Sequence, residues 1–363
     1  MMKTQSFALL VVAVMATPSA ADTLTKADGT VVSDVTVLSE TYEAVEYRVK
    51  DSRAKRSINA AEVRSIDYSR TNADYREGVA ALVKGDTILA ANLYVRAAED
   101  KKIPAHVRAS ALVQAADILV AEGDSANAVS VYDQLIRDHS KTRHLARALL
   151  GKGKAALYSG DTTTALAAFE TLILDAREKG FGEQWALEAE FMAVRSKHVI
   201  GTDLPTIQSA YQDLQNRAKT AGIQSIALGC SLRLARLHLD NDEPMAAFPM
   251  FNNIIKGRLE SSREVAAEAF NGRGRCFVAM AEILRANDDE ESAIDEYATA
   301  RLDFLRVHVH YPDVQGQQAE ALFWAAQCFE NVQDTDAGRH AAILKKRLTS
   351  RFPESAWAKQ VAR

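Results

Sequence analysis

Three stretches of the sequence share one pattern at fixed spacing and decide the fold of most of the chain: GVAALVKGDTILAANLY at residues 78–94, ADILVAEGDSANAVSVY at 116–132 and GKAALYSGDTTTALAAF at 153–169. Each begins with a small residue, contains a Gly-Asp pair and continues with an alanine and, four positions later, an aromatic residue. The shared positions are Gly78, Gly85, Ala90, Tyr94, Ala116, Gly123, Ala128, Tyr132, Gly153, Gly160, Ala165 and Phe169. One structural unit therefore recurs along the chain.

The pattern predicts a helical hairpin. Glycine adopts the positive φ that ends a first helix, and the aspartate after it can cap a second helix by accepting hydrogen bonds from backbone N–H groups. The small residue and the alanine let two antiparallel helices approach closely. The aromatic residue lies on the same helix face as the alanine and is expected to fill the space against the next hairpin.

This hairpin resembles the tetratricopeptide repeat (TPR), whose copies stack into a superhelix. The family's small eighth residue, its alanine at position twenty and its aromatic residue at position twenty-four all match, whereas its early tryptophan and first-helix tyrosine are missing. Looser copies follow, with markers at Tyr211, Phe251, Tyr297 and Ile343. The resemblance implies a right-handed α-solenoid of about seven hairpins over residues 71–363.

The C-terminal part carries a second resemblance. Tyr311-Pro312 and Phe352-Pro353-Glu354-Ser355 are similar to the hairpin ends of bacterial envelope repeats, as in the Tol–Pal-associated cell-division coordinator and the barrel-assembly lipoproteins. Proline stops one helix and serine can cap the next. The resemblance implies an envelope protein, although the coordinator's trimerising coiled coil and a lipoprotein cysteine are absent from the sequence.

Residues 22–70 predict a small β module instead. Asp28-Gly29 is a turn signal, and short β-branched runs follow it. The segment weakly resembles SH3-like and Sm-like barrels, with Asn59 and Val63 where that pattern usually has proline and isoleucine. The basic segment 50–56 could meet an anion such as phosphate, and a solvated hairpin loop is the simpler interpretation.

Residues 1–21 have the features of a signal peptide. Lys3 precedes an apolar run over residues 7–16, Pro18 breaks that run, and Ser19-Ala20-Ala21 supplies small residues before a cleavage point at Ala21/Asp22. A buried N-terminal helix is the alternative. The apolar run is too short to span a bilayer. We therefore expect a soluble, exported and periplasmic protein.

Composition and motifs argue against catalysis. Of the 363 residues 47% are apolar, 25% are charged and 62 are alanine, and the net charge of −4 disfavours a general nucleic-acid binder. Cys230, Cys276 and Cys328 lack metal-site spacing, and His308 and His310 point apart on a helix. No nucleophile elbow or phosphate-binding loop is found. We predict no enzyme activity, cofactor or metal.

The predicted function is a scaffold or adaptor that binds an envelope protein or peptide through the concave surface of the repeats. The repeat register places five candidate residues there: Tyr75, Asp117, Arg147, Lys154 and Arg236. Three alternatives stay open: a structural component that self-assembles into homo-oligomers, a cell-wall or carbohydrate-binding protein that uses the β module, and an enzyme subunit with a pocket at His308 or His310.

Overall fold

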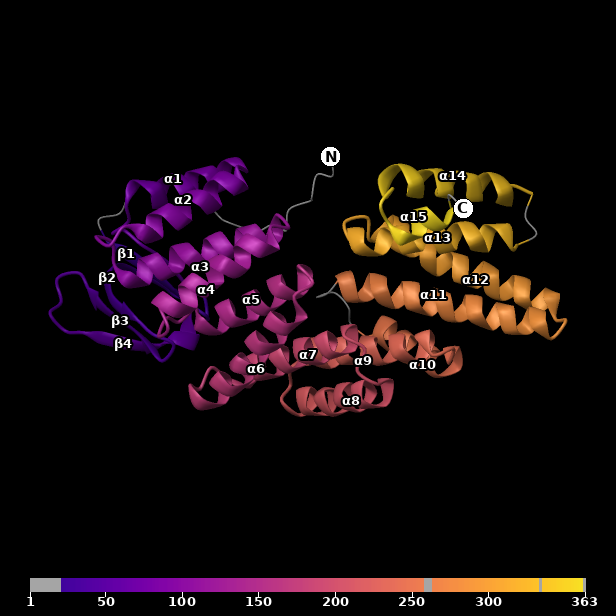
Figure 1. Ribbon diagram of the computed structural model, residues 1–363, viewed down its shortest axis with the longest axis horizontal. Coiled ribbons are helices and arrows are strands. Elements are labelled where there is room, and N and C mark those ends of the chain that lie inside the picture. The colour runs from indigo at the N-terminus through magenta and orange to yellow at the C-terminus, as the bar shows by residue number, and fades with distance from the viewer. Residues whose placement is uncertain (1–20, 258–262, 333–334, 362–363) are drawn as a thin grey trace. The chain divides into compact units, whose positions relative to one another are not determined.

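The computed structural model describes residues 21–257, 263–332 and 335–361 (Figure 1). The chain divides into two compact units, Met1–Gly201 and Thr202–Arg363. Nearly all of the predicted signal peptide lies outside the described residues. Within the described ranges, unit 1 contains a five-stranded antiparallel sheet and seven α-helices, and unit 2 contains eight α-helices. The predicted mainly helical fold with a β module at its front is confirmed.

The sheet of unit 1 has the strand order β4-β3-β2-β1-β5. Its strands are β1 Asp22–Lys26, β2 Val31–Glu40, β3 Ala44–Val49, β4 Arg56–Asn59 and β5 Val63–Asp67, with a 3₁₀ turn at Ala60–Glu62 between the last two. All pairs are antiparallel. One face buries an apolar core that includes Leu24, Val35 and Val45, as alternating side chains along a strand require.

Within each unit, every helix packs against the next one in the chain. Those of unit 1 are α1 Ala73–Lys84, α2 Thr87–Glu99, α3 Ala105–Ala121, α4 Ser125–Asp138, α5 Leu145–Tyr158, α6 Thr162–Glu178 and α7 Glu183–Val199. Those of unit 2 are α8 Leu204–Thr220, α9 Gln224–Asp240, α10 Pro244–Lys256, α11 Arg263–Ala286, α12 Glu290–His310, α13 Gln315–Glu330, α14 Ala337–Arg351 and α15 Ala356–Val361. The turn between α7 and α8 coincides with the boundary between the units.

The predicted turns form as expected, with one exception. Gly85, Gly123 and Gly160 have φ values of 84°, 83° and 84°, and the next helix starts two residues later. The side chains of Asp124 and Asp161 cap α4 and α6. The predicted side-chain cap by Asp86 is wrong, because that exposed carboxylate makes no cap hydrogen bond.

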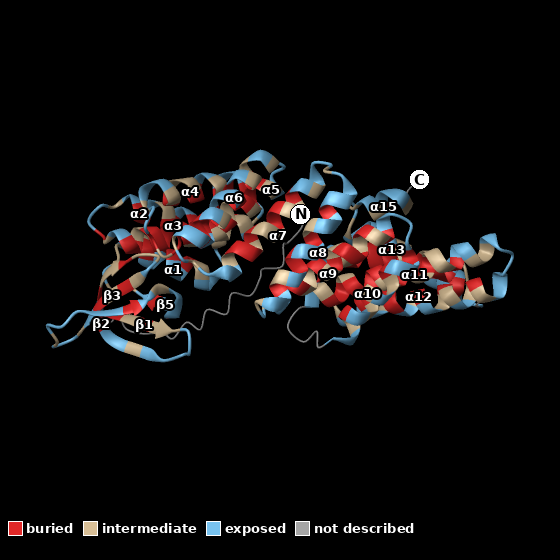
Figure 2. Cartoon of the chain, turned by 90° about the horizontal axis from the view of Figure 1, so that it is seen from below, coloured by how far each residue is buried: buried red, intermediate tan, exposed pale blue. Residues whose placement is uncertain are grey.

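Close contacts between aromatic rings and glycines hold neighbouring helices together. A Cβ atom on Gly153 would lie closer than 3.0 Å to the Phe169 ring, and one on Gly151 would lie equally close to the Tyr132 ring. Gly272 has the same relation to Phe251. Buried rings are therefore packed directly on helix backbone, where the missing side chain leaves room for them. Figure 2 shows buried residues along the helices of each unit.

The predicted markers of the later repeats are buried, with one exception in the last copy. Tyr211, Phe251 and Tyr297 are buried. The prediction that Ile343 is the marker of the last copy is wrong, because 42% of this residue is exposed. Helix α14 instead buries Leu344 and Leu348, so the packed face is offset by one residue from the predicted register.

Replacing Gly153 by alanine tests the ring-on-backbone contact. The new methyl group would overlap the fully buried Phe169 ring, and such overpacking costs about 1–3 kcal/mol. The matched control is Gly316→Ala in α13, where a Cβ meets nothing within 4 Å. Thermal unfolding followed by circular dichroism should show a lower midpoint for Gly153→Ala only. Equal or higher midpoints for both variants would contradict the packing.

Candidate functional site

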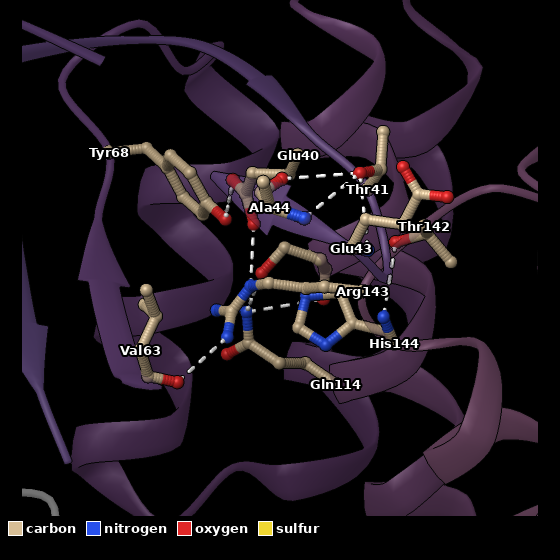
Figure 3. A network of polar contacts seen from close by, with 11 residues as sticks. Glu40, Thr41, Glu43, Ala44, Val63, Tyr68, Gln114, Thr142, Arg143 and His144 are labelled. Atoms are coloured by element: carbon tan, nitrogen blue, oxygen red, sulfur yellow. Dashed lines mark hydrogen bonds and ion pairs between the residues drawn. The ribbon is translucent and has the colours of Figure 1, made fainter. Parts of the chain in front are cut away.

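A buried polar network joins the sheet to the helices of unit 1 (Figure 3). Glu40, at the end of β2, accepts hydrogen bonds from Tyr68 Oη at 2.6 Å and from Arg143 Nε at 2.5 Å. Arg143 lies between α4 and α5 and also donates to the carbonyl of Val63. Burial raises the pKa of Glu40, and the Arg143 guanidinium acts in the opposite direction.

Further contacts extend this junction across several hairpins. The backbone N–H of Tyr42 donates to the Lys141 carbonyl at 3.0 Å. The Tyr42 ring meets the Phe181 ring, which precedes α7, and Tyr68 meets the His106 ring at the start of α3. The sheet thus contacts three successive connections between hairpins, and the β module is a fixed part of unit 1.

Asp22 ties the start of the sheet to its end. Its carboxylate is buried and accepts from the backbone N–H groups of Val37 and Ser69, both at 2.8 Å, and from the Ser69 hydroxyl at 2.7 Å. Ser69 follows β5 and leads into α1. The first strand, the second strand and the start of the helical array are therefore joined by one side chain.

A second polar surface lies on the first helix of each hairpin. Helix α5 contacts both α3 and α7, and helix α11 contacts both α9 and α13. We call the side of α1, α3, α5 and α7 that bears polar contacts between these helices the first-helix face of unit 1, and the corresponding side of α9, α11 and α13 the first-helix face of unit 2. Each is described by itself.

On the first-helix face of unit 1, polar side chains connect successive first helices. Gln114 of α3 donates to Tyr75 Oη of α1 at 3.0 Å. Arg147 of α5 forms an ion pair with Asp117 of α3, which also accepts from the Tyr132 hydroxyl.

The same face continues to α7 through Lys154. Its Nζ lies 2.9 Å from Glu188 Oε1. The Arg147 side chain is 51% exposed and that of Lys154 is 33% exposed, so both cations retain access to solvent.

The first-helix face of unit 2 contains a denser cluster of ion pairs. Arg236 of α9 reaches Glu320 of α13 at 2.9 Å, although α11 lies between these helices in sequence. Arg275 of α11 lies 3.9 Å from the same carboxylate and over the ring of Trp324. Separately, Arg233 pairs with Glu268 at 2.9 Å. Arg236, whose side chain is 19% exposed, and buried Glu320 therefore neutralise each other with little exposure to water.

All five residues selected from the repeat register lie on these faces, in two settings. Tyr75 is buried, and Asp117 and Arg236 are mostly covered. Arg147 and Lys154 are more open. Sequence reasoning missed the partners Glu188, Arg275 and Glu320. A search for opposite charges about one repeat apart would have found Glu188, which lies 34 residues after Lys154.

The described part of the chain also contains thiol groups and a surface hollow outside these faces. No group of three His, Cys, Asp or Glu residues there could hold a metal ion, and no helix there is long and apolar enough to cross a membrane. Cys230, Cys276 and Cys328 are buried free thiols, and burial raises the pKa of each to about 12.

An open hollow of about 440 Å³ lies at the turn between α1 and α2.

The junction predicts a pH dependence through His106. Burial, with a smaller contribution from the positive charge of Arg70, lowers its pKa from 6.5 to about 4. Between pH 6.5 and about pH 4, His106 therefore carries a proton in the unfolded chain but not in the folded chain. Protonation of His106 in the unfolded chain does not affect the free energy of unfolding above pH 6.5. It lowers that free energy as the pH falls toward 4.

Urea unfolding of His106→Phe should measure this loss. Between pH 7 and 4.5, the wild type should lose about 2 kcal/mol more unfolding free energy than the variant, which keeps a ring against Tyr68. His310→Gln, at an exposed position, is the control and should keep the wild-type slope. Parallel slopes for wild type and His106→Phe would refute the prediction.

Comparisons with known proteins give one family match and several similar solved structures. Residues 110–142 match the family model described as tetratricopeptide repeat. A search of curated proteins finds no match. One similar solved structure is the apo form of the quorum sensor NprR from B. thuringiensis, with 11% identity, 80% of this chain and 79% of that chain covered, and a TM-score of 0.49.

Two further structures have lower scores. The C-terminal part of a TPR repeat-containing protein from Cytophaga hutchinsonii has 13% identity, covers 80% of this chain and 99% of that chain, and has a TM-score of 0.43. The Rap conjugation gene regulator of plasmid pLS20, in complex with the Phr* peptide, has 13% identity, 78% and 87% coverage, and a TM-score of 0.41. Residues 110–142, which match the tetratricopeptide repeat model, span most of α3 and all of α4.

Proposed function

We propose that the chain is a non-catalytic adaptor that binds an extended, acidic peptide segment of a partner protein on the first-helix face of unit 1. The observation that carries this proposal is a stripe on α5. Arg147, Lys154 and Tyr158 are separated by seven and four residues, so they lie on one side of the helix, and 62% of Tyr158 is exposed. Two cations and one exposed ring thus face the same way.

The geometry of this stripe favours an extended ligand. Seven residues of helix rise about 10 Å, which equals about three residues of an extended peptide. Carboxylates three residues apart in such a peptide therefore match the spacing of Arg147 and Lys154. Pairing with Asp117 and Glu188 holds the two cations in place, and this lowers the entropy that binding costs.

Peptide selection on the immobilised full chain tests the proposal. A random twelve-residue display library should yield peptides enriched in Asp and Glu. In fluorescence polarisation, the double variant Arg147→Gln/Lys154→Gln should bind them about tenfold or more weakly, because charge-assisted hydrogen bonds are lost. Tyr158→Ser removes an exposed ring and should also weaken binding while leaving the fold intact.

The matched control is Lys101→Gln/Lys102→Gln, at exposed positions between α2 and α3. It removes the same charge and should bind the selected peptides like the wild type. Selected peptides without acidic enrichment, or equal losses in the control and the α5 variants, would contradict an acidic ligand on this face.

We also propose that residues 1–21 direct export to the periplasm and are then removed. Strand β1 begins at Asp22, directly after the expected cleavage point. The buried contacts of the Asp22 carboxylate are all made by residues that remain. Cleavage there would leave the described sheet complete.

Expression of the full-length chain in a Gram-negative host tests export. N-terminal sequencing of the periplasmic fraction should find Asp22 as the first residue. Ser19→Leu/Ala21→Leu should prevent processing, since the cleavage site requires small residues. A cytoplasmic, full-length wild-type product would overturn export without bearing on peptide binding.

A further inference from the structure

A cluster of cations surrounds the turn between β3 and β4. Five basic residues fall within nine positions and are exposed, namely Arg48, Lys50, Arg53, Lys55 and Arg56. We call residues 48–56 the basic hairpin. Its one acidic residue is Asp51, so the segment carries a clear positive excess in a chain whose net charge is −4.

Four of these five cations have no carboxylate partner among the described residues. Lys55 lies 3.6 Å from Glu46, and both side chains of that pair are largely in solvent. For the other four cations, no carboxylate lies within ion-pair distance among the described residues of the chain. Structural ion pairing therefore does not account for the cluster.

The strand topology places the basic hairpin far from the helices of unit 1. The junction uses Glu40 and Tyr42, where β2 passes into β3. The basic hairpin lies at the opposite end of β3, which is six residues long, or about 20 Å away. Figure 1 shows the outer ends of β3 and β4 projecting away from the helices. Because the junction fixes the sheet, this basic end is presented in one direction.

We propose that the basic hairpin binds the surface of an anionic lipid bilayer. Each Lys or Arg near such a surface adds a favourable electrostatic contribution, and a projecting turn can reach a flat surface that the remainder of the unit cannot. No large apolar side chain of the hairpin is exposed, so the contact is peripheral and reversible.

The same residues suit nucleic acid less well. Single-stranded nucleic acids are held by exposed aromatic rings on which bases stack. The one aromatic residue of β3 and β4 is Tyr47, and it is buried. Charges on an edge strand also prevent pairing between sheets, a role that requires no lipid and that the experiment distinguishes.

Vesicle flotation with the full chain tests the proposal. Vesicles containing phosphatidylglycerol and phosphatidylcholine should carry the protein, and vesicles of phosphatidylcholine alone should carry much less. Lys50→Glu/Arg53→Glu should reduce the partition coefficient about tenfold or more, and 0.5 M NaCl should have a similar effect, since salt screens exposed charges. The acidic peptides selected on the first-helix face should still bind this variant.

Lys101→Glu/Lys102→Glu is the control, because it changes the net charge equally at exposed positions outside the sheet. It should float like the wild type. Equal flotation with both kinds of vesicle, or equal loss in both variants, would overturn the proposal. So would binding to a short DNA duplex at 0.15 M salt without binding to anionic vesicles. The milder variant Lys50→Gln/Arg53→Gln, with circular dichroism, separates lost binding from lost folding.

Discussion

The helical array depends on direct contact between aromatic rings and helix backbone. Phe169 against Gly153 and Tyr132 against Gly151 bring neighbouring helices closer than two side-chain layers would permit, because glycine has no Cβ. The first contact joins the helices of one hairpin and the second joins successive hairpins. The spacing of the first helices, and with it the reach of Lys154 to Glu188, follows from these contacts.

The junction adds a second constraint, which is electrostatic. Removing Glu40 and Arg143 from water is costly, and their ion pair, together with the Tyr68 hydroxyl, offsets this cost only in the correct geometry. The sheet therefore has one orientation on the helices of unit 1. Peptide binding on α5 and lipid contact by the basic hairpin would consequently occur at a fixed separation on one rigid unit.

Local features were predictable from the sequence, and long-range pairs were not. The positive φ of Gly123 and the cap by Asp124 depend on neighbouring residues alone. The ion pair of Glu40 and Arg143 spans 103 residues, and that of Arg236 and Glu320 spans 84, so each requires the tertiary fold. Ile343 failed as a marker because helix periodicity tolerates an offset of one residue, which packing alone decides.

The cysteines are distributed unequally, so thiol reagents can label only one of the two units. All three thiols lie in unit 2, one each on α9, α11 and α13, and their raised pKa values suppress the reactive thiolate while the fold is intact. Unit 1 contains no cysteine. The rate of cysteine alkylation in the unmodified chain would therefore measure the opening of unit 2 alone, because unit 1 has no thiol to react. No engineered label is needed.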